Sequence, residues 1–174
     1  AAHTFKKQLC CLDWCPNSLH QGVVAVGDTM GSVYITDVHK SNRMAESESS
    51  KVLFQAPTNR QANALAWNPN RANVLLCGLD RLRNGTGSVV VWDVMRSLNS
   101  DGATQIGNAL SRSSGAGPGQ RGSASSDAPS TIFEGGTNEG AVALSWVPGW
   151  KDLLMVGTNF KFLRLYDLRV QQAS

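Results

Sequence analysis

The chain has 174 residues, of which 41% are hydrophobic and 17% charged, and its formal net charge is +3. This length can bury a substantial core. The 16 basic residues are scattered along the chain, so the sequence does not indicate a nucleic-acid-binding surface. The longest apolar runs are too short to span a bilayer, which argues against direct membrane insertion.

The cysteines and histidines do not form a metal-binding pattern. Cys10, Cys11, Cys15 and Cys77 contain no Cys-x-x-Cys pair and have no paired histidines beside them, so a structural zinc site is not expected. Reduced cysteines inside apolar segments behave as small hydrophobic residues. We expect a cytosolic, reducing compartment, with no bound metal and no cofactor.

Three Trp-x-Pro anchors organise the chain, at Trp14 to Pro16, Trp67 to Pro69 and Trp146 to Pro148. Each anchor follows an alternation of small and large residues with the same phase, which predicts a β-strand. Proline lacks a backbone donor and ends that strand. The recurrence indicates a repeated structural unit.

The same further runs follow each anchor. A second apolar run ends in glycine, at Gly27, Gly78 and Gly157. A third run ends in aspartate, at Asp37, Asp93 and Asp167, and the last two follow aromatic residues, Trp92 and Tyr166. The predicted strands are 23–27, 74–78 and 153–157, then 32–37, 88–93 and 162–167. A fourth strand is predicted at 52–54 and at 131–133, with none after the third copy.

These runs are apolar on both faces, which a sheet with one wet face would not tolerate. Radially stacked antiparallel sheets cover one another, as in a β-propeller of four-stranded blades. We therefore expect an all-β partial propeller of about three blades, approximately 8–56, 62–135 and 141–168, with the last blade incomplete.

The repeat spacing supports this architecture once two segments are set aside. The anchor tryptophans are 53 and 79 residues apart, against a blade period of roughly 40–45. Removing the polar connector 39–50 leaves 41 residues, and removing the Ser/Gly-rich stretch 97–130 leaves 45. Segment 97–130 has almost no large apolar side chains, and its composition predicts a disordered insertion.

The Trp92-Asp93 ending, the glycine after the second strand and the repeat period together resemble a WD40 repeat. The middle segment is similar to the Mio (missing oocyte) family, which has Leu-Ala-Trp-Asn-Pro and Gly-Leu-Asp-Lys/Arg-x-Arg stretches at this spacing. Here these are residues 65–69 and 78–83. Leu144 to Pro148 and Tyr166 to Arg169 agree with the family in the third copy.

This resemblance implies a function that composition and spacing do not show. Family members are WD40-propeller subunits of the GATOR/SEA assembly, which relays amino-acid status to TORC signalling at the lysosomal or vacuolar surface. Members carry a complete propeller, a helical solenoid and a zinc-binding RING-like region, so the resemblance implies a fragment or a truncated product. The implied partners are the remaining blades of its own propeller and the propeller and solenoid proteins of the assembly. The implied location is cytoplasmic, peripheral at the lysosomal or vacuolar membrane.

The residues favour a non-enzymatic protein-interaction scaffold, because they supply no convergent catalytic group. The strand-ending aspartates are expected to accept hydrogen bonds in turns. Arg81 and Arg83 lie in a loop between strands and are candidate partner contacts, because arginine is favoured at interface cores. The alternative for them is a solvated loop in which they pair with Asp80.

Arg169 is a third candidate contact. The ending Tyr166-Asp167-Leu168-Arg169 resembles the aromatic-Asp-x-Arg ending of WD40 substrate receptors for cullin-type ubiquitin ligases. That resemblance keeps a ligase substrate-receptor adaptor as the alternative function.

Overall fold

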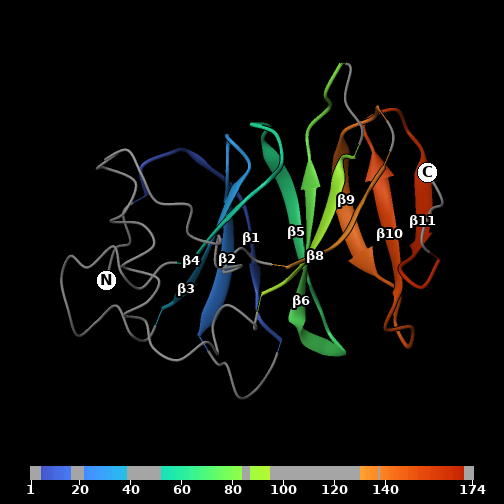
Figure 1. Ribbon diagram of the computed structural model, residues 1–174, viewed down its shortest axis with the longest axis horizontal. Coiled ribbons are helices and arrows are strands. Elements are labelled where there is room, and N and C mark those ends of the chain that lie inside the picture. The colour runs from blue at the N-terminus through green and yellow to red at the C-terminus, as the bar shows by residue number, and fades with distance from the viewer. Residues whose placement is uncertain are drawn as a thin grey trace, which may run out of the picture.

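A computed structural model describes residues 5–16, 22–38, 52–83, 87–94, 130–136 and 138–170. Within these ranges the secondary structure is all β, in three antiparallel sheets (Figure 1). The expected all-β class is therefore confirmed. The connector 39–50 and the stretch 97–129 lie outside the described residues, and Ser130 begins a strand.

The strands join in sequence order within each sheet. The first sheet contains β1 (Leu9–Trp14), β2 (Val23–Asp28), β3 (Ser32–Asp37) and β4 (Val52–Gln55). The second contains β5 (Ala62–Asn68), β6 (Arg71–Leu79), β7 (Val89–Asp93) and β8 (Ser130–Gly135). The third contains β9 (Ala141–Trp146), β10 (Leu153–Thr158) and β11 (Leu163–Asp167). These sheets of four, four and three strands confirm a partial propeller whose last blade is incomplete.

The first strands of the three sheets lie next to one another. β5 packs against β1 on one side and β9 on the other, and Figure 1 shows the blue, green and orange sheets side by side. Because each sheet starts at this shared inner position, its later strands lie progressively further out. This is the stacking of propeller blades.

The middle sheet is buried on both faces because alternate residues of β6 enter two different cores. Leu75, Cys77 and Leu79 join the core shared with the first sheet. Val74 and Leu76 join the core shared with the third. A fully buried aliphatic side chain contributes about 1.5–3 kcal/mol, so the continuous apolar run 74–77 stabilises two interfaces at once.

The outer faces carry exposed apolar side chains. On β11, Leu163 is 72% exposed and Leu165 is 61% exposed. Their cross-strand partners are Gly157 and Met155, and this face points away from the middle sheet. On the other side of the stack, β1 exposes Leu12 and Trp14. Both ends of the stack therefore present sheet faces suited to cover by another protein surface.

Several strand boundaries differ from the sequence-based expectation by one or more residues, and two of these differences follow from local hydrogen bonds. β6 begins at Arg71 instead of Val74, because the Asn68 side-chain oxygen accepts the backbone N–H groups of Asn70 (2.8 Å) and Arg71 (3.0 Å) and tightens the turn. β11 begins at Leu163 instead of Phe162, whose N–H donates to the Thr158 hydroxyl oxygen (3.3 Å) within the turn.

Candidate functional site

The anchor tryptophans tie neighbouring sheets together. The Trp67 indole Nε1–H donates to the carbonyl oxygen of Asp13 (3.3 Å), and the Trp67 backbone N–H donates to the Asp13 carboxylate (2.6 Å). The Trp146 indole Nε1–H donates to the carbonyl oxygen of Ala66 (3.0 Å). Asp13 and Ala66 each immediately precede an anchor tryptophan. The same bond therefore joins the first sheet to the second and the second to the third.

The other repeated residues sit around these ties. Trp14 is exposed on β1, and Pro16, Pro69 and Pro148 are exposed just beyond the ends of β1, β5 and β9. A Cβ at Gly27 would lie 2.8 Å from the Ala62 Cβ, and one at Gly78 would lie 3.1 Å from the Ala141 Cβ. Glycine at these positions lets the inner strand of the next sheet approach the backbone closely.

The strand-ending residues serve packing and turn formation. Trp92 is buried, with its ring 5.7 Å from that of Phe54. The Tyr166 ring is 5.9 Å from that of Phe133. Asp37 and Asp93 are half-buried at the ends of β3 and β7. A Cβ placed on Gly157 would lie 3.2 Å from the Ala143 Cβ.

Asp167, the strand-ending aspartate of the third repeat, pairs with Arg169. Its carboxylate accepts the Arg169 backbone N–H (3.0 Å) and the Arg169 Nε–H (2.8 Å). These hydrogen bonds lower the pKa of Asp167 to about 2. Arg169, a candidate partner contact, is therefore already engaged by a carboxylate of its own strand end.

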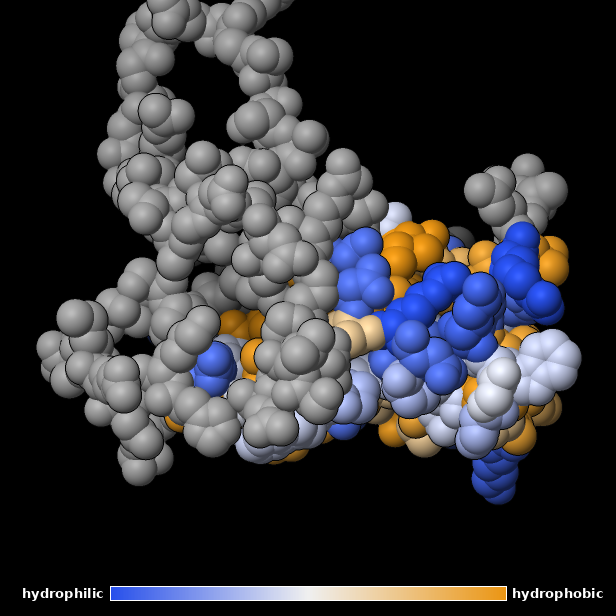
Figure 2. All heavy atoms as spheres, turned by 90° about the horizontal axis from the view of Figure 1, so that it is seen from below, coloured by the Kyte–Doolittle hydropathy of each residue, from blue (hydrophilic) through white to orange (hydrophobic). Residues whose placement is uncertain are grey.

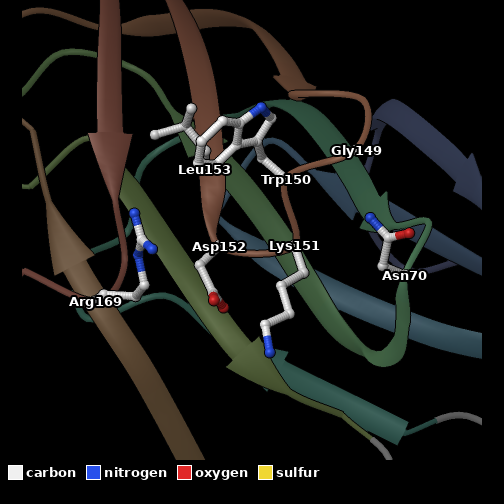
Figure 3. A pocket seen from close by; sticks show the side chains of 7 residues that line it. All are labelled: Asn70, Gly149, Trp150, Lys151, Asp152, Leu153 and Arg169. Atoms are coloured by element: carbon white, nitrogen blue, oxygen red, sulfur yellow. The ribbon is translucent and has the colours of Figure 1, made fainter.

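Arg169 also lines a pocket of about 390 Å³ at the lower end of the second and third sheets (Figure 3). The other lining residues are Asn70, Gly149, Trp150, Lys151, Asp152 and Leu153. Figure 3 shows Asp152 with Arg169 on one side and Lys151 on the other. Seen from below, the right-hand part of the molecule shows hydrophilic residues beside hydrophobic patches (Figure 2).

The pocket is held by contacts between turns of two sheets. The Asn68 side-chain amide donates to the Lys151 carbonyl oxygen (2.8 Å), and Arg71 pairs with Asp152 (3.1 Å). Trp150 remains 56% exposed at the mouth. Among the described ranges, no three His, Cys, Asp or Glu residues are grouped to hold a metal ion. The pocket offers an aromatic ring with mixed charges, which is a surface suited to binding.

Arg81 and Arg83 lie at the opposite end of β6, in the loop that follows it, and both are exposed. The Arg81 guanidinium carbon lies 5.1 Å from the centre of the Phe160 ring. The Asp80 carboxylate accepts the Arg81 backbone N–H (2.7 Å). In the described part of the chain, Asp80 forms no ion pair with the Arg81 or Arg83 side chain. The structure thus separates these two arginines from Arg169 by the length of a blade.

Arg60 is a buried residue of this region that the sequence reasoning missed. Its guanidinium donates to the carbonyl oxygen of Asp80 (3.2 Å) and to that of Gly87, and its Nε–H donates to the Thr58 hydroxyl oxygen (2.6 Å). Burial lowers the pKa of Arg60. A single arginine between two apolar segments gives no sequence signal for this role, because its partners are 20 and 27 residues away.

Within the described ranges, the chain has no helix that is long and apolar enough to cross a membrane.

Comparison with known proteins identifies similar sequences across most of the chain. The family described as "MIOS, WD40 repeat" matches residues 3–173. The GATOR2 complex protein MIOS of Dictyostelium discoideum is 31% identical over 183 residues, covering 91% of this chain and 15% of the relative. The Danio rerio GATOR2 complex protein MIOS is 28% identical over 165 residues, and the Xenopus laevis GATOR2 complex protein MIOS-A is 28% identical over 159 residues. Each alignment covers 91% of this chain and 17% of the relative. The chain therefore spans well under a fifth of the length of these relatives.

Proposed function

Since the chain belongs to the MIOS WD40 repeat family, we propose that it is a non-enzymatic scaffold segment that assembles with the other subunits of a GATOR2-type complex. The observation that carries the proposal is the match across residues 3–173. The stacked blades are consistent with it, because propellers share a scaffold and present binding surfaces on it.

The proposed role is to hold other proteins of the assembly, at the lysosomal or vacuolar periphery, in amino-acid signalling to TORC. The two uncovered sheet faces are the proposed contacts for further blades of the same propeller. The two ends of the blades, with Arg81 and Arg83 at one and Arg169 at the other, are the proposed contacts for separate subunits. Exposed arginine beside exposed aromatic rings is typical of interface hot spots.

The Arg169 contacts bear on the alternative, a substrate-receptor adaptor of a cullin-type ubiquitin ligase. A docking arginine must offer its guanidinium to the ligase adaptor. Arg169 instead pairs with Asp167 through Nε and stays 61% exposed as a side chain. The ligase-adaptor alternative stays open because the Arg169 side chain is exposed.

Affinity capture tests both functions in one experiment. The tagged chain is expressed in cells and its partners are identified by quantitative mass spectrometry, with Arg169→Ala and Lys151→Ala variants in parallel. We expect GATOR2 subunits with all three proteins. Recovery of a cullin adaptor by the parent chain, its loss with R169A and its retention with K151A would favour the ligase function. A folded chain that recovers no GATOR2 subunit would contradict the proposal.

A further inference from the structure

The turns that follow β2 and β10 have the same backbone geometry. In the first sheet the turn is closed by the Gly31 N–H donating to the Asp28 carbonyl oxygen (3.3 Å). In the third sheet the Lys161 N–H donates to the Thr158 carbonyl oxygen (3.2 Å). Two residues further along, Val33 pairs with Gly27 of β2, and Leu163 pairs with Gly157 of β10. Gly31 and Lys161 therefore occupy the same position of the repeat.

Lys161 holds a backbone conformation that suits glycine. Its φ is 70° and that of Gly31 is 77°, and among the described residues Lys161 is the one non-glycine residue with positive φ. A residue with a Cβ is destabilised in this left-handed region, because its Cβ lies too close to the backbone. Such strain is concentrated at binding and catalytic sites. The third sheet therefore carries a strained, exposed cation where the first sheet has glycine.

Two exposed aromatic rings flank Lys161, and each lies against an arginine. Phe160 is 45% exposed and has the Arg81 guanidinium 5.1 Å from its ring centre. Phe162 is 56% exposed and has the Arg164 guanidinium 5.5 Å from its ring centre. Guanidinium groups stack favourably on aromatic faces. The first contact joins the second and third sheets, and the second holds the Phe162 ring against β11.

Hydrogen bonds and a close backbone approach hold the loops that carry these side chains in place. The Gly140 N–H donates to the Asn159 side-chain oxygen (3.0 Å), and the Asn159 N–H donates to the Gly140 carbonyl oxygen (3.0 Å). A Cβ on Gly140 would lie 3.0 Å from both the backbone nitrogen of Arg81 and the Oδ1 atom of Asp80. Arg60 holds the Asp80 and Gly87 carbonyl groups on the other side. The binding groups are thus preorganised, which lowers the entropy cost of association.

The charge on this surface is positive, because the side chains of Arg81, Arg83 and Lys161 outnumber the exposed carboxylate of Asp80, which accepts the Arg81 backbone N–H. Arg164 is neutralised by a two-point pair with Glu139 (2.8 and 2.9 Å). In the part of the chain that the structure describes, the side chains of Arg81, Arg83 and Lys161 have no carboxylate partner. Arginine binds carboxylates through two parallel hydrogen bonds. The surface therefore offers two carboxylate-binding forks and one ammonium group around two apolar rings.

We propose that this surface, made of Arg81, Arg83, Phe160, Lys161 and Phe162, binds an acidic segment of a partner protein that places an apolar side chain between its carboxylates. The carboxylates pair with the three cations and the apolar side chain packs on the phenylalanines. A membrane fits less well, because the guanidinium groups lie against the phenyl rings that would have to insert between lipids. This inference rests on the proposed scaffold function and names the chemistry of one partner.

Fluorescence anisotropy with a labelled peptide, Glu-Glu-Asp-Leu-Glu-Asp-Trp-Glu, tests the proposal on the full chain. We expect saturable binding that weakens with added salt. A control peptide with amides in place of the carboxyl groups should not bind. Arg81→Ala and Phe160→Ser should each weaken binding about tenfold. Ile132→Ser, which changes an exposed apolar side chain of β8 outside this surface, should leave binding unchanged.

Lys161→Gly separates binding from folding. It relieves the left-handed strain, so the melting temperature should rise while peptide binding weakens. The proposal is overturned if the acidic peptide does not bind, if R81A and F160S bind as the parent does, or if phosphatidylserine vesicles bind and the peptide does not. Any of these results together with recovery of GATOR2 subunits leaves the scaffold function standing. If the peptide binds but no GATOR2 subunit is recovered, the scaffold function is rejected and the acidic-segment binding stands.

Discussion

The indole N–H of Trp146 donates a 3.0 Å hydrogen bond to the carbonyl oxygen of Ala66. Trp67 makes the equivalent bond to Asp13 one sheet earlier. Both tryptophans are buried, so the bonds join inner strands in a region with little competing water. The Trp-x-Pro repeat is therefore a coupling between blades as well as a strand ending.

Replacing Trp146 with Phe should destabilise the chain by about 1–3 kcal/mol. The change removes the indole donor of this bond to the Ala66 carbonyl oxygen, and it opens space in the core. Urea denaturation followed by circular dichroism measures the effect. Trp150→Phe is the matched control, because Trp150 is 56% exposed, and it should change stability by less than about 0.5 kcal/mol. Equal effects of the two substitutions would contradict the coupling.

The thiols of Cys11 and Cys77 should resist alkylation in the folded chain. Burial raises the pKa of Cys11 from 9.0 to about 12 and raises that of Cys77 also. Both remain protonated at pH 8, and the thiolate is the reactive form. Mass spectrometry after iodoacetamide treatment should find these two residues labelled only in urea. Labelling of native Cys77 at the rate seen in urea would refute its burial.

The same pKa shift predicts alkaline destabilisation. The unfolded thiol ionises near pH 9, whereas the folded Cys11 thiol ionises near pH 12. The protonated form is thus favoured by folding, and its contribution to the free energy of unfolding is complete below pH 9 and is lost as the pH rises through 12. Urea melts from pH 8 to pH 11 should show a falling midpoint. A Cys11→Ala variant should show a shallower fall, and an identical fall would exclude Cys11 as a cause.

The sequence predicted the blades better than the contacts between them. The Trp-x-Pro spacing and the double-sided apolar runs sufficed for three stacked sheets, because strand period and repeat length are local properties. The bonds from Asn68 to Lys151 and from Arg60 to Gly87 join residues 83 and 27 positions apart. No local pattern encodes such pairs. The stacking of Arg81 on Phe160 depends in turn on how closely two sheets approach at Gly140.

Self-association should occur through the uncovered sheet faces. Leu163 and Leu165 are largely exposed on β11, and Leu12 and Trp14 are exposed on β1. Because isolated repeat units expose faces that neighbours normally cover, the chain should form oligomers or aggregates in sedimentation velocity. Leu163→Lys with Leu165→Lys should reduce this association. A monodisperse parent chain that melts cooperatively would contradict the expectation.

Removal of the Arg169 side chain should raise the pKa of Asp167 from about 2 toward its ordinary value of 3.8, because the hydrogen bonds from Arg169 cause the depression. Carboxyl carbon chemical shifts measured by NMR between pH 1.5 and pH 6 report this pKa in Arg169→Ala and in the parent chain. Lys151→Ala, which changes a neighbouring cation of the same pocket, serves as the control. An unchanged Asp167 titration in R169A would show that the pair does not persist in solution.

Assembly is tested most directly by a chimera. Residues 3–173 replace the aligned segment of the Dictyostelium discoideum MIOS protein, in cells that lack their own copy. The account predicts that the purified chimera recovers the other GATOR2 subunits in the amounts that the natural protein recovers. A chimera that accumulates at the natural level, folds and recovers none of them would contradict the proposed scaffold function.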